Sequence, residues 1–303
     1  MDLQVKLPFL TLKNPILSAS GTFGYGLEFN KYGDISELGG VIVKGLSLKP
    51  RPGNPMPRIA ESACGMLNAI GLQNCGVEAF INKKLKYLPY NEVPIIANIY
   101  ANSESDFSEL ADILAREEGI AAIEVNISCP NVHEGGILFG QDPVQAAKVT
   151  AAVKKKAGEK PVIVKLSPNV TDITVIARAV EDAGADIISC INTLSGMAVD
   201  LKTRKPRLAN IIGGLSGPAI KPVALRCVWQ VCKAVKIPVI AIGGIVTAED
   251  VLEFIMVGAS AVQIGTANFM RPDLIFGLPK QVKTLGESLG LSSLAELRNS
   301  LSV

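Results

Sequence analysis

The sequence predicts an α/β fold, a (β/α)8 or TIM barrel with long loops at the C-terminal face of its strands. Eight apolar segments recur along the 303 residues, and most of them end in polar or glycine residues. Most are rich in Val and Ile without regular alternation, as is typical of parallel strands buried on both faces. The segments are 16–20, 40–44, 94–99, 121–127, 161–166, 186–191, 238–242 and 261–265. We therefore expect one barrel domain that spans residues 1–303.

Helix signals fall between several of these strands. Polar and acidic residues open the segment 105–118, and Gly119 follows its end. Three further segments behave similarly, with a glycine near each end, and they are 143–157, 172–183 and 248–256. The tail, residues 292–303, is expected to form a short final helix. A doubly wound sheet is the alternative fold, but the glycine-rich segment 21–26 lacks the spacing of a dinucleotide-binding fingerprint.

Composition and charge exclude several classes of function. Hydrophobic residues make up 48% of the chain and charged residues 19%, which suits buried strands covered by helices. A net charge of +2 gives no basic footprint for nucleic acid. No run reaches the roughly 18 apolar residues needed to cross a membrane, and residues 1–6 lack the layout of a signal peptide. We expect a cytoplasmic protein that binds neither nucleic acid nor membranes.

The cysteines and the single histidine limit the chemistry further. None of the six cysteines forms a C-x-x-C pair, and zinc and iron–sulfur sites usually show such spacing, so no metal site is expected. In a cytoplasmic chain they are expected to be free thiols. His133 is the only histidine, and no partner pattern for a catalytic triad accompanies it. Proton chemistry therefore falls mainly on cysteine, lysine or carboxylates.

Two connections, residues 45–93 and 193–237, are too long for a plain strand–helix unit. Both follow predicted strands, so in a barrel both lie at the C-terminal face, where active sites are built. Loops of this length are usually functional lids or partner surfaces. We expect the two connections to cover or border the active site.

Cys129 is the candidate reactive residue. It lies just past the apolar run 121–125, in a loop between Asn126 and Asn131 and shortly before the glycine-rich segment 135–140. A small buried cysteine is the structural alternative, and it is common on strands. The position beyond the strand, beside a proline and a loop that could close, favours a chemical role.

Polar side chains and glycines recur at the ends of the predicted strands. In chain order they are Ser20, Lys44, Asn98, Asn126, Lys165, Asn192, Thr193, Gly243, Gly244, Gly265 and Thr266. A single asparagine is a common turn residue, but three asparagines and two lysines at corresponding places favour a binding site. Polar groups that converge on one barrel mouth suit a planar ligand with many hydrogen-bonding groups.

The glycines after the seventh and eighth strands predict a phosphate site. In barrels, backbone N–H groups at this position commonly hold a phosphate, and the segment 213–217 could add a further close approach of the backbone. Each glycine motif is weak alone, since turns also use glycine. A phosphate there, with Lys165 deeper in the mouth, fits flavin mononucleotide (FMN), whose reduced anionic form a fixed cation would stabilise.

Several of these motifs together resemble class 1 dihydroorotate dehydrogenases, and the likeness covers nearly the whole chain. The motifs are residues 126–131, 43–45, 68–72, 164–168, 191–193, 242–245 and 264–266. The resemblance implies an FMN-bound barrel that oxidises (S)-dihydroorotate to orotate in pyrimidine (UMP) biosynthesis. In that reaction Cys129 would be the base that removes the C5 proton, while the hydride from C6 passes to the flavin.

The resemblance also implies two sets of binding residues. The substrate set is Lys44, Asn68, Ala69, Ile70, Gly71, Leu72, Asn126, Asn131, Asn192 and Thr193. The FMN set is Ser20, Lys44, Gly45, Asn98, Asn126, Lys165, Ile191, Gly217, Gly243, Gly244, Gly265 and Thr266.

Within the family, residues 133–143 resemble the heteromeric, NAD-linked form (class 1B) more than the fumarate-using homodimer (class 1A). That form implies an iron–sulfur flavoprotein partner that carries FAD and the iron–sulfur cluster, in a heterotetramer with two copies of each chain. The membrane-bound class has a serine base and an N-terminal extension. Cys129 and the roughly fifteen residues before the first predicted strand disfavour that class.

Four alternatives stay open at this point. Within flavin chemistry, the chain could be a class 1A enzyme, or another FMN barrel that acts on a dihydropyrimidine, as in dihydropyrimidine dehydrogenase. Outside it, the chain could be a flavin-free, phosphate-binding isomerase or lyase that uses Lys165. A non-catalytic scaffold is the fourth, although it gives no reason for Cys129 beside two asparagines. Flavin absorbance of the purified protein separates these classes.

Overall fold

The computed structural model describes residues 1–128 and 139–302. Within them, eight parallel strands form one sheet in the order β3-β16-β15-β10-β9-β8-β7-β4. Leu17 bridges Gly40 in parallel, and the Ser18 amide donates to the Gly40 carbonyl at 3.2 Å, so the two end strands meet and the sheet closes. The predicted (β/α)8 barrel is confirmed. Its strands are β3 (Ile16–Ser18), β4 (Val41–Ile42), β7 (Ile95–Ile99), β8 (Ala122–Asn126), β9 (Val162–Leu166), β10 (Ile187–Cys190), β15 (Val239–Ile242) and β16 (Ala261–Ile264).

Each barrel strand lies inside one of the eight predicted segments, and most are shorter than predicted. The segment 40–44, for example, is paired as a strand only at Val41–Ile42, so Lys44 lies just past the ladder. The strands are buried at nearly every position because helices cover their outer face and side chains fill the interior. The unpaired ends of the strands are therefore the places where side chains reach the barrel mouth.

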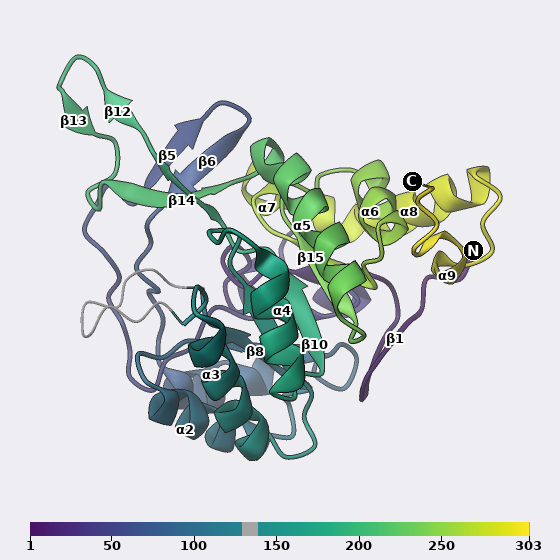
Figure 1. Ribbon diagram of the computed structural model, residues 1–303, viewed down its shortest axis with the longest axis horizontal. Coiled ribbons are helices and arrows are strands. Elements are labelled where there is room, and N and C mark those ends of the chain that lie inside the picture. The colour runs from purple at the N-terminus through teal and green to yellow at the C-terminus, as the bar shows by residue number, and fades with distance from the viewer. Residues whose placement is uncertain (129–138, 303) are drawn as a thin grey trace.

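The four predicted helices are present with slightly different ends. They are α2 (Glu104–Ala115), α3 (Pro143–Lys156), α4 (Ile173–Asp182) and α6 (Ala248–Met256). A side-chain cap fixes each start, since Ser103, Asp142 and Asp172 each accept from a backbone amide in the first turn. Thr247 and Asp250 form a capping box at α6. The helices lie around the outside of the strands (Figure 1).

The remaining elements lie outside those four helices, and α9 falls within the predicted final helix. The helices are α1 (Val77–Lys83), α5 (Lys221–Ala234), α7 (Ala267–Met270), α8 (Leu274–Ser288) and α9 (Leu294–Leu297). The 3-10 helices are η1 (Leu27–Phe29), η2 (Ile35–Glu37), η3 (Leu85–Tyr87) and η4 (Pro218–Ile220), and β1 (Val5–Leu7) pairs with β2 (Leu10–Leu12) as an antiparallel hairpin. The predicted final helix was too long, because α9 ends at Leu297 and the next residue, Arg298, is extended.

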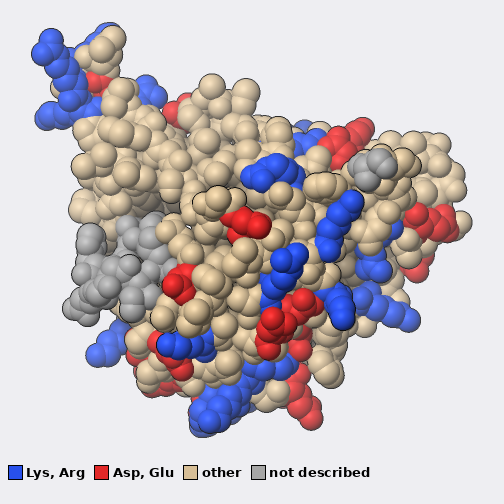
Figure 2. Space-filling view, in the orientation of Figure 1, with Lys and Arg blue, Asp and Glu red and all other residues tan. Residues whose placement is uncertain are grey.

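The two long connections build a second, antiparallel sheet. The first supplies β5 (Ile59–Ser62) and β6 (Gly65–Asn68), and the second supplies β11 (Leu194–Met197) and β14 (Ile212–Ser216), in the order β11-β14-β6-β5. A short hairpin, β12 (Val199–Asp200) with β13 (Lys205–Pro206), extends from it. Figure 1 shows these strands standing apart from the outer helices. Lysines and arginines gather at the tip of the hairpin in Figure 2.

The structure gives no sign of a membrane span or a metal centre in the residues it describes. No helix there is long and apolar enough to cross a membrane. The same residues contain no group of three or more histidine, cysteine or acidic side chains placed to hold a metal ion.

Candidate active site

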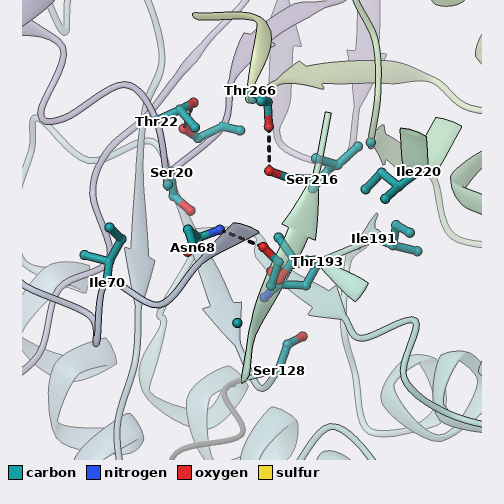
Figure 3. Close-up of a pocket in the computed structure, with 18 of the residues that line it drawn as sticks. Ser20, Thr22, Asn68, Ile70, Ser128, Ile191, Thr193, Ser216, Ile220 and Thr266 are labelled. Atoms are coloured by element: carbon teal, nitrogen blue, oxygen red, sulfur yellow. Dashed lines mark hydrogen bonds between the residues drawn. The ribbon is translucent and has the colours of Figure 1, made fainter. Parts of the chain in front are cut away.

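One cavity of about 650 Å³ opens at the carboxyl ends of the barrel strands, beneath the second sheet. Side chains from the strand ends and from the second sheet point into it in Figure 3. Two hydrogen bonds connect its lining: Thr266 Oγ1 to Ser216 Oγ at 2.8 Å, and Asn68 Nδ2 to the Gly214 carbonyl at 3.3 Å. The second sheet therefore forms part of the cavity wall.

The predicted site residues that the structure describes all line this cavity. From the substrate set they are Lys44, Asn68, Ala69, Ile70, Gly71, Leu72, Asn126, Asn192 and Thr193. From the FMN set they are Ser20, Lys44, Gly45, Asn98, Asn126, Lys165, Ile191, Gly217, Gly243, Gly244, Gly265 and Thr266. Cys129, Asn131 and His133 lie outside the described residues. The structure thus brings the described residues together, and their roles stay predictions.

Lys44 supplies a positive charge that forms no ion pair with another described residue. It follows β4, and its backbone amide is fixed by the Gly24 carbonyl at 2.7 Å. Burial lowers the pKa of the Lys44 ammonium, and the positive charge of Arg58 lowers it further. Both causes disfavour the charged form in the free protein. An anionic ligand at Lys44 would offset both of them.

Asn126 and Asn192 form a linked pair of carboxamides at the ends of β8 and β10. Asn126 Oδ1 accepts from Asn192 Nδ2 at 3.3 Å and from the Ser128 amide at 3.2 Å. Asn192 Oδ1 in turn accepts from the Thr193 amide at 2.8 Å. Because its oxygen is engaged, Asn126 presents its amino group as the donor toward the cavity.

The glycines after β15 and β16 leave backbone donors exposed to the cavity. Gly243 and Gly244 have φ of 132° and 74°, a region that favours glycine. Within the described residues, the amides of Gly244, Gly265 and Thr266 donate to no protein acceptor. A β-carbon on Gly265 would meet nothing nearer than Ala19 Cβ at 3.7 Å, so this wall is open. Free amides around an open space suit a phosphate.

The deeper part of the cavity fits the ring system of FMN. Asn98 Oδ1 is buried and has no hydrogen-bond partner in the described chain, so it is an acceptor that needs a donor. Lys165 is 5% exposed, and its ammonium makes no hydrogen bond or ion pair with a described residue. An orphaned acceptor and an unpaired cation match a ring with both N–H and electron-rich atoms.

Sequence reasoning missed part of the lining. Ser128, Ser195, Asn210 and Ile212 also line the cavity, as does Asn169. Asn169 donates to the Thr193 carbonyl at 2.9 Å and accepts from the Ser195 amide at 2.9 Å, so it ties the end of β9 to the second sheet. Its position three residues beyond β9 follows the same pattern as the other strand-end residues and was the available signal.

Within the described residues, a closed (β/α)8 barrel has free amides after its last two strands and a polar cavity at its mouth, an arrangement in which barrels commonly hold a phosphate group. The family model for dihydroorotate dehydrogenase matches residues 2–285. The chain belongs to the dihydroorotate dehydrogenase family.

Relatives within the family confirm the predicted resemblance to the NAD-linked form. A protein of Solidesulfovibrio magneticus is 67% identical over 303 residues, which cover 100% of this chain and 99% of the relative. A protein of Maridesulfovibrio salexigens is 65% identical and one of Pelobacter propionicus 56% identical, each over 99% of this chain and 98% or more of the relative. All three are named dihydroorotate dehydrogenase B (NAD(+)), catalytic subunit.

Proposed function

We propose that this chain oxidises (S)-dihydroorotate to orotate in pyrimidine biosynthesis, as the FMN-dependent catalytic subunit of an NAD-linked dihydroorotate dehydrogenase. The observation that carries the proposal is the single cavity that gathers the described residues of both predicted sets. Full-length similarity to proteins with that name supports it. Residues 1–303 would form one FMN-binding domain, and a cytoplasmic location stays a prediction.

The substrate would bind between Lys44 and the linked asparagines. Its carboxylate would pair with the Lys44 ammonium, whose pKa is lowered in the free protein because burial disfavours the charge. Asn126, with its oxygen engaged, would donate from Nδ2 to a substrate carbonyl. Asn68 and Thr193, which also line the cavity, would fix the ring in plane.

FMN would be held by its phosphate at one end and its ring at the other. The amides of Gly244, Gly265 and Thr266 would take the phosphate, since they lack protein acceptors within the described chain. Asn98 and Lys165 would contact the polar ring edges. When bound, FMN would supply the acceptor for the hydride that leaves C6 of the substrate.

Cys129 would be the general base in this account. Its thiolate would take the C5 proton, and the C5–H electron pair would form the C5–C6 double bond as the C6 hydride departs. Cys129 lies outside the described residues. Its neighbours in the chain, Asn126 and Ser128, line the cavity, which supports a place for the thiol beside the substrate.

Electrons would leave through a partner. The relatives are each named as a catalytic subunit of an NAD(+)-using enzyme. We infer that this chain pairs with an iron–sulfur flavoprotein subunit that carries FAD and the cluster, in a heterotetramer with two copies of each chain.

Turnover assays test this proposal. The purified chain, with its FMN, should oxidise dihydroorotate slowly with NAD⁺, and addition of the iron–sulfur flavoprotein subunit should restore rapid turnover. Fast turnover of the isolated chain with fumarate would place it in the homodimeric class instead. Efficient NAD⁺ reduction without a partner would contradict the division of labour.

A further inference from the structure

A buried carboxylate lies inside the barrel, and no role predicted from the sequence includes it. Glu124, on β8, is fully buried, and its side chain accepts three hydrogen bonds from three other strands. Oε1 accepts from Asn98 Nδ2 on β7 at 2.6 Å. Oε2 accepts from Ser189 Oγ on β10 at 2.8 Å and from Gln263 Nε2 on β16 at 2.6 Å.

This arrangement uses Glu124 as an acceptor on both oxygens. Within the described residues Glu124 forms no ion pair. A buried carboxylate without a cationic partner is costly unless hydrogen bonds replace its water, and the three donors do so. These hydrogen bonds hold the Glu124 side chain in contact with Asn98, Ser189 and Gln263.

The hydrogen bond to Glu124 fixes which way the Asn98 carboxamide faces. Asn98 and Glu124 are direct neighbours in the β7–β8 register. Because a carboxylate oxygen can only accept a hydrogen bond, the Asn98 amino group turns toward Glu124 Oε1 and the Asn98 Oδ1 atom turns away. Asn98 Oδ1 is buried and has no hydrogen-bond partner among the described residues, and it lies against the cavity wall, where a β-carbon on Gly45 would be 2.8 Å from it.

We propose that Glu124 is a positioning residue for cofactor binding: it holds Asn98 with its oxygen toward the cavity, as an acceptor for an N–H group of the flavin ring. The proposal rests on the proposed FMN function. Without the Glu124 acceptor, the Asn98 amide is free to turn and can present its amino group where the ring needs an acceptor.

FMN titration of the apoprotein tests this role directly. Glu124→Met removes both acceptor oxygens at similar volume and should weaken FMN binding by about tenfold or more, because one buried hydrogen bond is lost or reversed. In an Asn98→Ala background the same substitution should change the affinity less than about twofold, since a positioning residue acts through Asn98. Glu124→Gln keeps one oxygen for Asn98 and should restore most of the affinity.

Controls separate this role from general stability. Ser189→Ala removes a donor from the same carboxylate but leaves the Asn98 bond, so its FMN affinity should match the wild type even if its melting temperature falls. If Glu124→Met does not fold, Glu124→Asp is measured, because it keeps the charge and withdraws it by one methylene group. Weakened binding in Glu124→Asp is then expected.

Three results would overturn the inference. They are unchanged FMN affinity in folded Glu124→Met, unchanged affinity in Glu124→Asp, and an equal loss in the presence and absence of the Asn98 side chain. Failure of the wild-type apoprotein to bind FMN would instead contradict the proposed function.

Discussion

Gly214 lies directly against Thr193: a β-carbon on Gly214 would be 2.1 Å from Thr193 Oγ1. Gly214 is on β14 of the second sheet, and Thr193 follows β10 of the barrel. The φ of Gly214 lies outside the left-handed region, so the close approach to Thr193, not backbone strain, requires glycine at this position.

Gly214→Ala should therefore displace Thr193 and weaken substrate binding. We expect an orotate affinity about tenfold lower, with FMN still bound because the phosphate glycines are elsewhere. Perturbation of the flavin absorbance on orotate addition measures it. Gly277→Ala, in α8, is the matched control, because its β-carbon meets only the flexible end of Gln281 at 3.2 Å. Normal orotate binding in Gly214→Ala would show that Thr193 does not contribute to substrate binding.

The lowered pKa of Lys44 predicts how orotate binding depends on pH. Burial is the larger cause of the shift and the Arg58 charge the smaller one. A bound anion favours protonated Lys44, so affinity should be highest below the lowered pKa of free Lys44. It should then fall as pH rises through that value, which lies below the ordinary value of 10.5. Orotate titrations across alkaline pH measure this fall in affinity, which is the alkaline limb of the pH profile.

Two variants check the assignment of that limb. Lys44→Gln should lose about tenfold or more in orotate affinity at neutral pH and should show no alkaline limb of its own. Arg58→Gln removes the neighbouring positive charge and should move the limb to higher pH. A limb that stays in place in both variants belongs to another group.

Lys44 also affects stability in the same pH range. Between its lowered pKa and 10.5 the folded protein binds fewer protons than the unfolded chain, so the free energy of unfolding should rise with pH there.

Gly265 tests the phosphate site without disturbing the fold. A β-carbon there has its nearest contact at 3.7 Å, and its φ lies outside the left-handed region. Gly265→Ala should fold with a melting temperature of the apoprotein close to that of the wild type. It should nevertheless bind FMN about tenfold more weakly or worse, because the methyl group enters the space proposed for the phosphate. Equal FMN affinity in the two proteins would place the phosphate elsewhere.

Cys129→Ala should leave FMN bound and lower the rate of flavin reduction by dihydroorotate by about 10²–10⁴-fold at neutral pH. The reason is the loss of the proposed base for the C5 proton. Cys129→Ser should regain rate only at high pH, since a serine hydroxyl loses its proton much less readily than a thiol. Cys64→Ala is the control, because Cys64 is exposed on the turn between β5 and β6. Near-normal reduction in Cys129→Ala would assign the base to another residue.

The sequence alone predicted those features of the fold and the site that depend on a local pattern of residues. Apolar runs that break at Lys44, Asn126 or Lys165 mark both a strand and the residue at its end, so the barrel and most of its mouth could be predicted. The same rule applied to Asn169 would have found one more lining residue.

Nonlocal pairing explains what was missed. The second sheet joins Met66 with Ser216, and neither loop carries a pattern that names its partner. Glu124 stood inside an apolar run, and its role depends on donors from three other strands. The α5 helix lay within a connection expected to be loop, and the final helix was predicted too long because its polar tail has no packing signal.

Anaerobic mixing of the purified FMN-loaded chain with dihydroorotate tests the central claim most directly. The account predicts that absorbance near 450 nm bleaches within the mixing experiment without any partner subunit, because substrate and flavin meet in one cavity of this chain. Orotate should appear in an amount equal to the flavin reduced. A chain that holds FMN but stays oxidised with dihydroorotate in excess would contradict it.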